Sequence, residues 1–125
     1  MGQPTIPTNW VLTKKVGDGK KNGDFKARLT VRGDMEQGDS KTDSPTVNRE
    51  SVKLAMALAA ANNFEIATLD VCAAFLQGVC PDRTIFLRPP PEVGTDKIWV
   101  LRKPAYGLKD ASRLWYKALR IFFLD

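Results

Sequence analysis

The sequence predicts an α+β fold, or a mixed α/β arrangement, in which helices pack on one face of a mainly antiparallel sheet. The chain has 125 residues, of which 43% are hydrophobic and 26% charged, a composition typical of one folded domain. Several short apolar or alternating segments are typical of strands. Two segments rich in helix-forming residues, 48–61 and 110–123, are typical of helices. The expected order is strand, strand, helix, strand, hairpin, helix.

The first part of the chain is expected to form a hairpin. Residues 1–9 contain two prolines and little hydrophobic pattern, which indicates a flexible lead-in. Strands are expected over 10–16 and 25–31, with turn signals at 17–19 and 22–23 between them. In the second strand apolar residues alternate with polar ones, so one face of the hairpin should be basic.

The middle of the chain contains the strongest helix signal. Residues 48–61 are rich in Ala, Leu and Met, with Asn48 as the expected cap and 62–63 as the stop. Apolar residues cover most of its circumference, so we expect this helix to be largely buried. A strand is then expected over 64–71, followed by a short helical turn over 72–77.

The last third of the chain predicts a small hairpin and a final helix. The two strands are expected over 85–88 and 97–101. Asp110 is expected to cap a helix that runs to about Phe123. One face of this helix is apolar and should meet a core, and the other face is basic. The apolar face comprises Ala111, Leu114, Trp115, Ala118 and Phe122.

Composition excludes several classes of chemistry. The chain has no His, which excludes His-dependent catalytic triads and His-ligated zinc, and its two Cys cannot form a four-ligand zinc site. The longest apolar stretch, 54–61, is too short to span a membrane. Because no apolar signal sequence is visible, we expect an intracellular protein, cytoplasmic or nuclear, and not a secreted one.

Asp70 is the most informative candidate site residue. It stands near the end of an expected apolar strand, where a carboxylate is exposed and can bind Mg²⁺ through oxygen. The alternative is that Asp70 only caps the turn that follows. Position alone does not decide between these two interpretations.

Basic residues form two candidate surfaces for phosphate. Lys26, Arg28 and Arg32 share one face of the second strand, and arginine forks match phosphate oxygens. A second stripe on the final helix could follow a nucleic-acid backbone, and comprises Lys109, Arg113, Lys117 and Arg120. Both stripes are also typical of solvated surfaces. Trp115 and Tyr116 could stack on bases, although the helical spacing of Trp115 is typical of a core residue.

Six motifs in order resemble one family. They are Trp10-Val-Leu, Phe25-Lys-Ala-Arg-Leu-Thr-Val-Arg-Gly33, Asp43-Ser-Pro-Thr-Val47, Leu69-Asp-Val-Cys-Ala-Ala-Phe-Leu-Gln-Gly78, Ile85-Phe-Leu-Arg-Pro-Pro90 and Lys103-Pro-Ala-Tyr-Gly-Leu-Lys-Asp-Ala-Ser-Arg-Leu-Trp-Tyr116. This series is similar to the amino-terminal part of the reverse transcriptase of copia-type long-terminal-repeat retrotransposons. The resemblance implies a partial reverse transcriptase domain over 10–125, with a fingers hairpin and the first half of the palm of a right-hand polymerase fold.

The resemblance also implies roles for individual residues. Asp70 would be the catalytic aspartate that binds Mg²⁺ or Mn²⁺, and the carbonyl of Val71 would be an accessory metal ligand. Phe75 would screen the 2′-hydroxyl of the incoming deoxynucleotide, and Tyr106 would lie beside that nucleotide and the template. Lys26 and Arg28 would hold the triphosphate, and the turn that contains Lys109 and the basic position Arg113 also match the family. With the pattern-based candidates Arg32 and Lys117, Lys109 and Arg113 form the expected contact with an RNA or DNA primer-template.

The chain departs from the family in ways that affect the expected activity. No Asp-Asp pair occurs in it, and two-metal nucleotidyl transfer needs more than one carboxylate. Cys72, Ala73 and Ser112 also stand where the family commonly has other residues. We therefore expect the chain to be inactive alone, marginally stable, and able to self-associate through an uncovered sheet edge. A non-catalytic nucleic-acid-binding protein derived from a retroelement, and a non-functional remnant, stay open as alternatives.

Overall fold

A four-stranded sheet forms the centre of the molecule. The computed structural model describes residues 4–15 and 24–124. The sheet order is β2-β1-β3-β4, and its strands are β1 (Thr5–Lys15), β2 (Asp24–Val31), β3 (Phe86–Arg88) and β4 (Trp99–Val100). The pairs β1–β2 and β3–β4 are antiparallel, and β1–β3 is parallel. The mainly antiparallel sheet of an α+β fold is therefore confirmed, with one parallel pair added.

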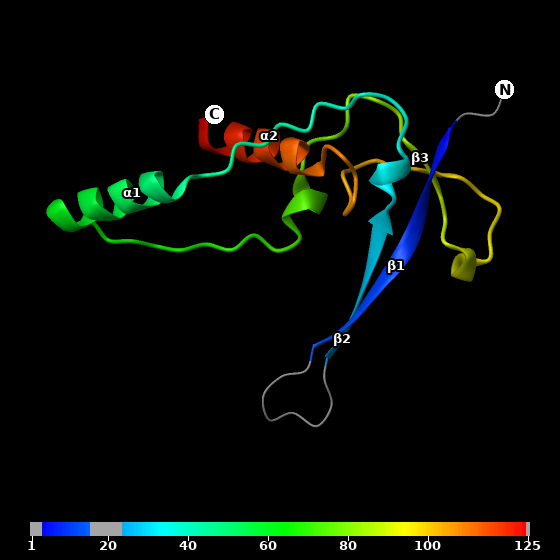
Figure 1. Ribbon diagram of the computed structural model, residues 1–125, viewed down its shortest axis with the longest axis horizontal. Helices are drawn as coiled ribbons and strands as arrows, with labels where there is room; N and C mark the ends of the chain where they lie inside the picture. The colour runs from blue at the N-terminus through cyan, green and yellow to red at the C-terminus, as the bar shows by residue number, and fades with distance from the viewer. Residues whose placement is uncertain (1–3, 16–23, 125) are drawn as a thin grey trace.

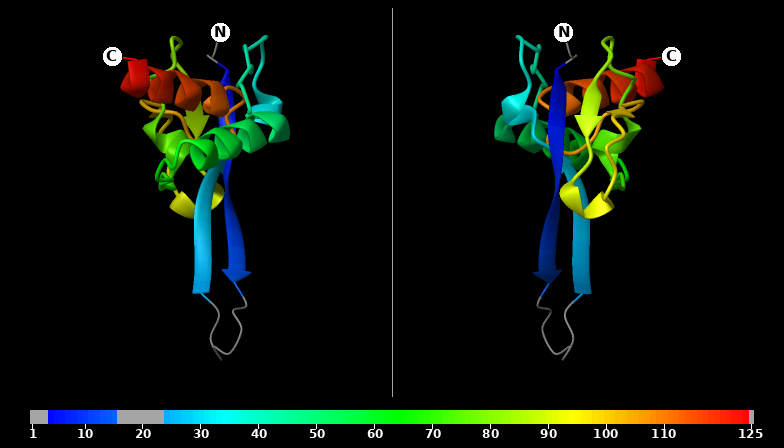
Figure 2. Two further views of the ribbon diagram at one scale, coloured as in Figure 1. Left: turned by 90° about the vertical axis from the view of Figure 1, so that its left-hand side faces the viewer. Right: turned by 90° about the vertical axis from the view of Figure 1, so that its right-hand side faces the viewer.

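The hairpin of β1 and β2 extends from the sheet as a narrow two-stranded ribbon (Figure 1; Figure 2). Its register sets Trp10 opposite Leu29 and Leu12 opposite Ala27, so one face is mostly apolar. The neighbouring pairs, which include Val11 with Arg28, form the opposite face. The expected hairpin is confirmed along its strands, while its turn signals at 17–19 and 22–23 lie outside the described residues.

Strand β1 begins earlier than the sequence pattern predicts. The prediction of a flexible lead-in is wrong for residues 5–9, which belong to β1. Ile6 and Thr8 are buried there, and Thr8 donates a hydrogen bond from Oγ1 to the carbonyl oxygen of Arg88 at 2.8 Å. The partner of this segment is β3, about eighty positions away in the chain. A local pattern does not contain that partner, which is why the prediction failed.

A small core lies where the base of the hairpin meets β3 and the start of the last helix. Its buried apolar side chains are Ile6, Val31, Ile85, Leu87, Leu108, Ala111 and Leu114. Phe75 and Trp99 pack against this core from the side. Burying such a core supplies most of the stability of a small domain.

Helix α1 (Arg49–Ala61) forms as predicted but is not buried. Asn48 caps it, because the Oδ1 of this residue accepts a hydrogen bond from the backbone N–H of Ser51 at 2.7 Å. No residue of α1 is buried, and the helix is set apart from the sheet (Figure 1). The prediction of a buried helix packed on the sheet is therefore wrong for α1. Among the described residues, no helix or strand covers the apolar side chains that favour burial of α1.

The segment that follows α1 also differs from the prediction. Residues 64–71 form no strand, and Leu69 is 91% exposed. A strand needs a ladder partner, and this segment has none within the described residues. The helical turn expected next is confirmed as the 3₁₀ helix η2 (Ala74–Gln77).

The last helix, α2 (Ala111–Leu124), is buried only at its beginning. Ala111 and Leu114 belong to the core, whereas Phe122 is exposed, so the predicted core-facing side is correct only for the first turns. The short helices η1 (Gly33–Met35) and η3 (Pro91–Val93) complete the fold. No helix in the described part of the chain is both long and apolar enough to cross a membrane.

Candidate active site

Asp70 lies on an open hollow of about 460 Å³ between the 69–71 segment and α2. The hollow is lined mostly by apolar side chains of α2, which include Trp115 and Leu119. Asp70 is the one acidic side chain among the described residues that line it. The carboxylate is exposed, and it makes no hydrogen bond or ion pair with the rest of the described chain. The side chain is therefore free to bind a ligand, although the strand that was expected to carry it does not form.

The residues around Asp70 supply only part of a metal site. Within residues 4–15 and 24–124, no three His, Cys, Asp or Glu side chains lie close enough together to hold a metal ion. Asp70 offers one carboxylate, and Val71 beside it offers a backbone carbonyl. Mg²⁺ usually takes one or two carboxylates together with water and phosphate oxygens. These two residues therefore fit part of a divalent metal site and do not complete one.

Phe75 and Tyr106 are brought together by the fold. Their ring centres are 6.0 Å apart with planes at 78°, an edge-to-face arrangement. Phe75 belongs to η2, and the carbonyl oxygen of Tyr106 accepts a hydrogen bond from the N–H of Val31 at 2.7 Å. The fold thus brings into contact two residues that lie far apart in the sequence and that the resemblance assigns to nucleotide binding.

Three glycines lie where one part of the backbone packs directly against another. Gly107 has φ +83°, and a Cβ there would overlap the carbonyl oxygen of Val31. A Cβ on Gly33 would overlap the carbonyl oxygen of Gly107, and the N–H of Gly33 donates to that same oxygen at 3.1 Å. At Gly78, a Cβ would lie 3.0 Å from the backbone carbon of Leu114. The end of the hairpin therefore meets the segment before α2, and the end of η2 meets α2, at positions where a side chain does not fit.

The basic residues predicted to bind phosphate fall into separate groups. Lys26 and Arg28 lie on the same face of β2 and are exposed. Arg32 forms an exposed ion pair with Asp34 at 2.7 Å, and their hydrogen bond raises the pKa of Arg32 and lowers that of Asp34. Lys109 donates from Nζ to the backbone oxygen of Glu36 at 2.8 Å. Arg32 and Lys109 thus already bind other groups of this protein.

The stripe on α2 is less open than the sequence predicts. Arg113 and Lys117 are half-buried, and Arg120 is exposed. Lys117 and Arg120 lie beside Ile121 along a second hollow, of about 540 Å³. The stripe is therefore interrupted by apolar surface. Trp115, half-buried, lines the hollow beside Asp70 and is not part of the main core.

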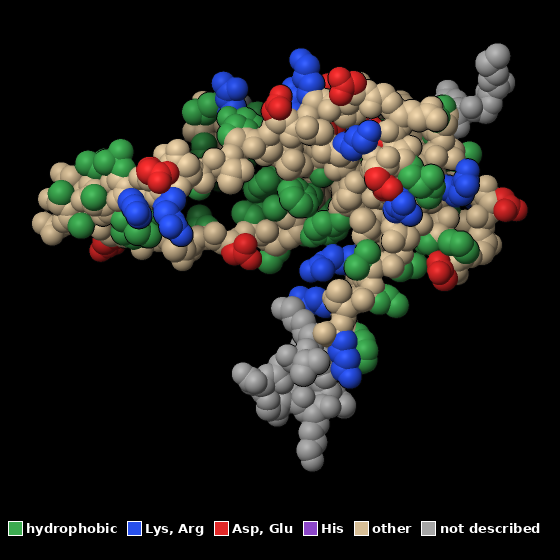
Figure 3. Space-filling model, in the orientation of Figure 1, with side chains coloured by type: hydrophobic (Ala, Val, Ile, Leu, Met, Phe, Trp, Pro, Cys, Tyr) green, Lys and Arg blue, Asp and Glu red, His purple; other side chains and the backbone are tan. Residues whose placement is uncertain are grey.

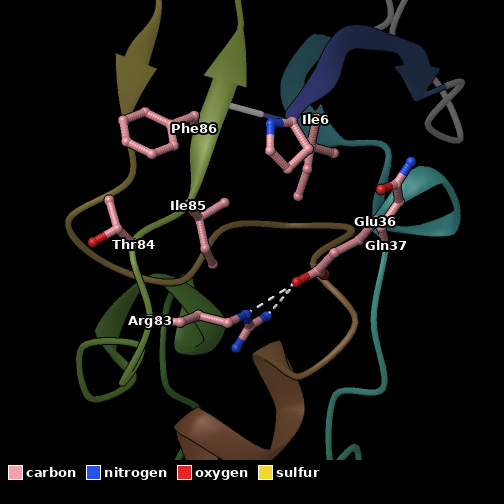
Figure 4. Close-up of a pocket in the computed structure, with 8 residues that line it drawn as sticks. Ile6, Glu36, Gln37, Arg83, Thr84, Ile85 and Phe86 are labelled. Carbon is pink, nitrogen blue, oxygen red and sulfur yellow. Dashed lines mark hydrogen bonds and ion pairs between the residues drawn. The ribbon is translucent and has the colours of Figure 1, made fainter. Parts of the chain in front are cut away.

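The sequence analysis did not predict a network of ion pairs that the structure contains. Arg83 donates from Nη1 to Asp110 at 2.5 Å and from Nη2 to Glu36 at 2.6 Å. The carboxylate side chains of Glu36 and Asp110 are only 7% and 5% exposed. The hydrogen bond to Asp110 is the main reason that the pKa of Arg83 is raised above its ordinary value, against the lowering effect of burial. Figure 4 shows Arg83 reaching Glu36 below Ile6 and Ile85, beside a cavity of about 120 Å³.

This network changes the expected role of Asp110. The sequence predicts a side-chain cap for α2, and that prediction is wrong because both carboxylate oxygens bind Arg83. The helix begins instead with the backbone oxygen of Asp110, which accepts from the N–H of Leu114 at 2.9 Å. The partners are separated by 27 and 47 positions, so no local pattern in the chain indicates the pairing.

Comparison with known proteins identifies the family. A family model described as reverse transcriptase (RNA-dependent DNA polymerase) matches residues 1–125. The chain is 35% identical, over 95% of its length, to the retrovirus-related Pol polyprotein from transposon RE2 of Arabidopsis thaliana. It is 34% identical, over 85% of its length, to the transposon Ty1-NL2 Gag-Pol polyprotein of Saccharomyces cerevisiae.

These relatives are much longer proteins. The chain spans 9% of the length of the Arabidopsis polyprotein and 6% of the yeast one. No solved structure matches the chain. The family match covers the whole sequence, and the transposon polyproteins agree with the copia-type resemblance of the six motifs. The chain belongs to the reverse transcriptase (RNA-dependent DNA polymerase) family, as a copia-type member.

Proposed function

We propose that this chain supplies the fingers and the first part of the palm of an RNA-directed DNA polymerase with a right-hand fold. The observation that carries the proposal is the exposed carboxylate of Asp70, which has no partner in the described part of the chain, in a member of the reverse transcriptase family. In this function Asp70 and the carbonyl of Val71 are ligands of a divalent ion, Mg²⁺ or Mn²⁺. When bound, that ion would stabilise charge on the phosphates during nucleotidyl transfer.

The other residues then bind and orient the substrates. Phe75, braced by the edge of Tyr106, forms a rigid wall beside the incoming deoxynucleotide. Lys26 and Arg28 are exposed on the hairpin, where they can meet the triphosphate. Arg113 and Lys117 on α2 are the remaining candidates for contact with the primer-template backbone. The remaining carboxylates that a two-metal reaction needs are not among the described residues, so we expect this chain alone not to extend a primer.

Primer extension tests the role of Asp70. We would replace the matching segment of a transposon Pol relative with this chain, and supply Mg²⁺, an RNA template and deoxynucleotides. Asp70→Asn should reduce extension to background, because the carboxylate that holds the metal is lost. Asp96→Asn removes an exposed carboxylate from the β3–β4 connection and should leave extension unchanged. Equal activity of the Asp70→Asn chimera and the wild-type chimera would refute the proposal.

A non-catalytic nucleic-acid-binding protein is the second candidate. It is favoured by the net charge of +5 and by the exposed Lys26 and Arg28 on the projecting hairpin. Binding of this chain alone to a primer-template duplex should weaken as salt rises, since phosphate contacts release counterions. The double variant Lys26→Ala and Arg28→Ala should lower the salt slope by about 2, whereas Lys53→Ala on α1 should not. Binding without extension in the chimera would favour this second candidate.

A further inference from the structure

The backbone turns sharply between Asp70 and Phe75, and Ala73 forms the turn. Ala73 has φ 52° and ψ 41°, a left-handed conformation. In the described part of the chain, Asn63 is the one other non-glycine residue with a positive φ. Asparagine adopts this conformation more readily, whereas the Cβ of alanine crowds a carbonyl oxygen and no polar side chain compensates. The turn at Ala73 is therefore strained.

One side-chain hydrogen bond closes this turn. Gln77, the last residue of η2, donates from Nε2 to the carbonyl oxygen of Cys72 at 2.7 Å. Within the turn, the N–H of Leu76 donates to the carbonyl oxygen of Ala73 at 2.9 Å. The net free energy of one hydrogen bond is of the same order as the cost of a left-handed alanine. The hydrogen bond from Gln77 can therefore offset the strain at Ala73.

The segment before the turn is weakly held. Among the described residues, the bond from Gln77 is the one hydrogen bond that joins the 65–72 segment to another part of the chain. The hollow between this segment and α2 is open and bordered by hydrophobic side chains (Figure 3). Asp70 and Val71 belong to this segment and line the same hollow as Gln77. Because burial does not fix these two residues, their position depends on the turn.

The segment after the turn is firmly held. The ring of Phe75 packs edge-to-face on Tyr106 and lies against the core. Beyond η2, the N–H of Val79 donates to the carbonyl oxygen of Leu114 in α2 at 3.1 Å. Gln77 therefore joins a weakly held segment to a firmly held one.

We propose that Gln77 is a positioning residue that fixes Asp70 and Val71 relative to Phe75. The inference rests on the proposed function, in which Asp70 and Val71 hold a divalent ion and Phe75 lies beside the nucleotide. Gln77 touches neither the ion nor the nucleotide, and its amide acts through the carbonyl oxygen of Cys72. The relative position matters because nucleotidyl transfer requires the ion and the nucleotide to meet in one geometry.

Hydrogen exchange of the intact chain tests the turn without any reaction. Gln77→Met keeps the length of the side chain and removes its donor. Exchange at the N–H groups of Leu76 and Gly78, which close η2, should become about fivefold faster, the factor that one net hydrogen bond supplies. Because Gln77 is exposed, the urea midpoint should not change.

Gln37→Met is the matched control for this experiment. Gln37 is also exposed, and its side chain makes no hydrogen bond within the described residues. The control should leave the exchange of η2 at the wild-type rate. Unchanged exchange at Leu76 and Gly78 in Gln77→Met would overturn the proposal.

A second substitution separates the turn from a general loss of packing. Ala73→Gly removes the Cβ that makes the left-handed conformation costly. Added to Gln77→Met, it should return the exchange at Leu76 toward the wild-type rate, because the turn no longer needs the amide. Fast exchange that Ala73→Gly does not reverse would show that Gln77 acts through packing, and the positioning role would be wrong.

The transposon Pol chimera extends the test to the reaction. Gln77→Met should raise the Mg²⁺ concentration for half-maximal extension by about fivefold and lower the preference for deoxynucleotides over ribonucleotides. Ala73→Gly should reverse both changes. If Asp70→Asn abolishes extension and Gln77→Met changes neither quantity, the positioning role is wrong and the proposed function stands. If Asp70→Asn leaves extension intact, the proposed function is wrong, and the exchange rates still decide whether Gln77 holds the turn.

Discussion

The two α-helices of this protein have nearly the same length but differ in how far they are buried. α1 has 13 residues and none of them is buried, while α2 has 14 residues and contributes Ala111 and Leu114 to the core. The two helices also differ in the contacts that fix their first residues. α1 starts at a local cap, whereas α2 starts at Asp110, whose carboxylate is fixed by Arg83. Helix formation is thus local here, and burial depends on contacts made across the fold.

The largest expected effect comes from removing the close backbone contact beside α2. Gly107→Ala would set a Cβ against the carbonyl oxygen of Val31 at a positive φ, so the hairpin and the segment before α2 would have to separate. We expect a loss of more than about 4 kcal/mol of stability, measured by urea denaturation. Gly38→Ala is the control, because it has a similar φ of +96° and open space around it. Its cost should be about 1–2 kcal/mol. Equal effects would show that strain alone, and not the close contact, matters.

The ion network should come next. Arg83→Met leaves the buried carboxylates of Glu36 and Asp110 without their partner, which should cost about 3–5 kcal/mol. We expect the loss of stability to lie near the lower end of this range, because Arg83 itself is partly exposed. Arg32→Met breaks the exposed pair with Asp34 and should leave the urea midpoint unchanged. A small loss of stability in Arg83→Met would mean that apolar contacts alone hold α2 against the core.

Matched truncations test the two helices directly. Leu114→Ala removes a side chain that is 2% exposed and should cost about 2–5 kcal/mol. Leu54→Ala removes an exposed side chain and should change the unfolding midpoint of the monomer little. Urea denaturation at low protein concentration compares the two variants. A cost of similar size for Leu54→Ala would show that α1 is packed in solution and that the contrast between the helices is wrong.

The smallest expected effect concerns the cap of α1. Asn48→Ala removes the hydrogen bond to the N–H of Ser51 and should weaken the helix by about 1 kcal/mol. Because α1 is set apart from the core, the loss should appear as faster hydrogen exchange within α1 and not as a lower midpoint for the whole domain. Lys53→Ala is the control for loss of a polar side chain, because Lys53 is exposed in the middle of α1 and makes no hydrogen bond within the described residues. A lower unfolding midpoint for the whole domain in Asn48→Ala would indicate that α1 and the core form one cooperative unit.

Local patterns predicted the elements whose hydrogen bonds are short-range. The hairpin strands, the capped helix α1, the turn at η2 and the helix α2 all form where the sequence indicates. The candidate site was predictable to the same extent: Asp70 is exposed, but the apolar run before it did not produce a strand. Phe75 and Tyr106 were named from the family resemblance, and their contact appears only in the fold.

The sequence by itself determined the family, the charge and the local helices and turns, because motif identity and hydrogen bonding between near neighbours are both written along the chain. Only the tertiary structure decided that Thr5 begins a strand, that Arg83 joins Glu36 to Asp110, and that α1 stays uncovered. Each of these outcomes depends on a partner distant in sequence, or on its absence among the described residues. The free energy of burial or of ion pairing is a property of both partners together, and a pattern within one segment records only one of them.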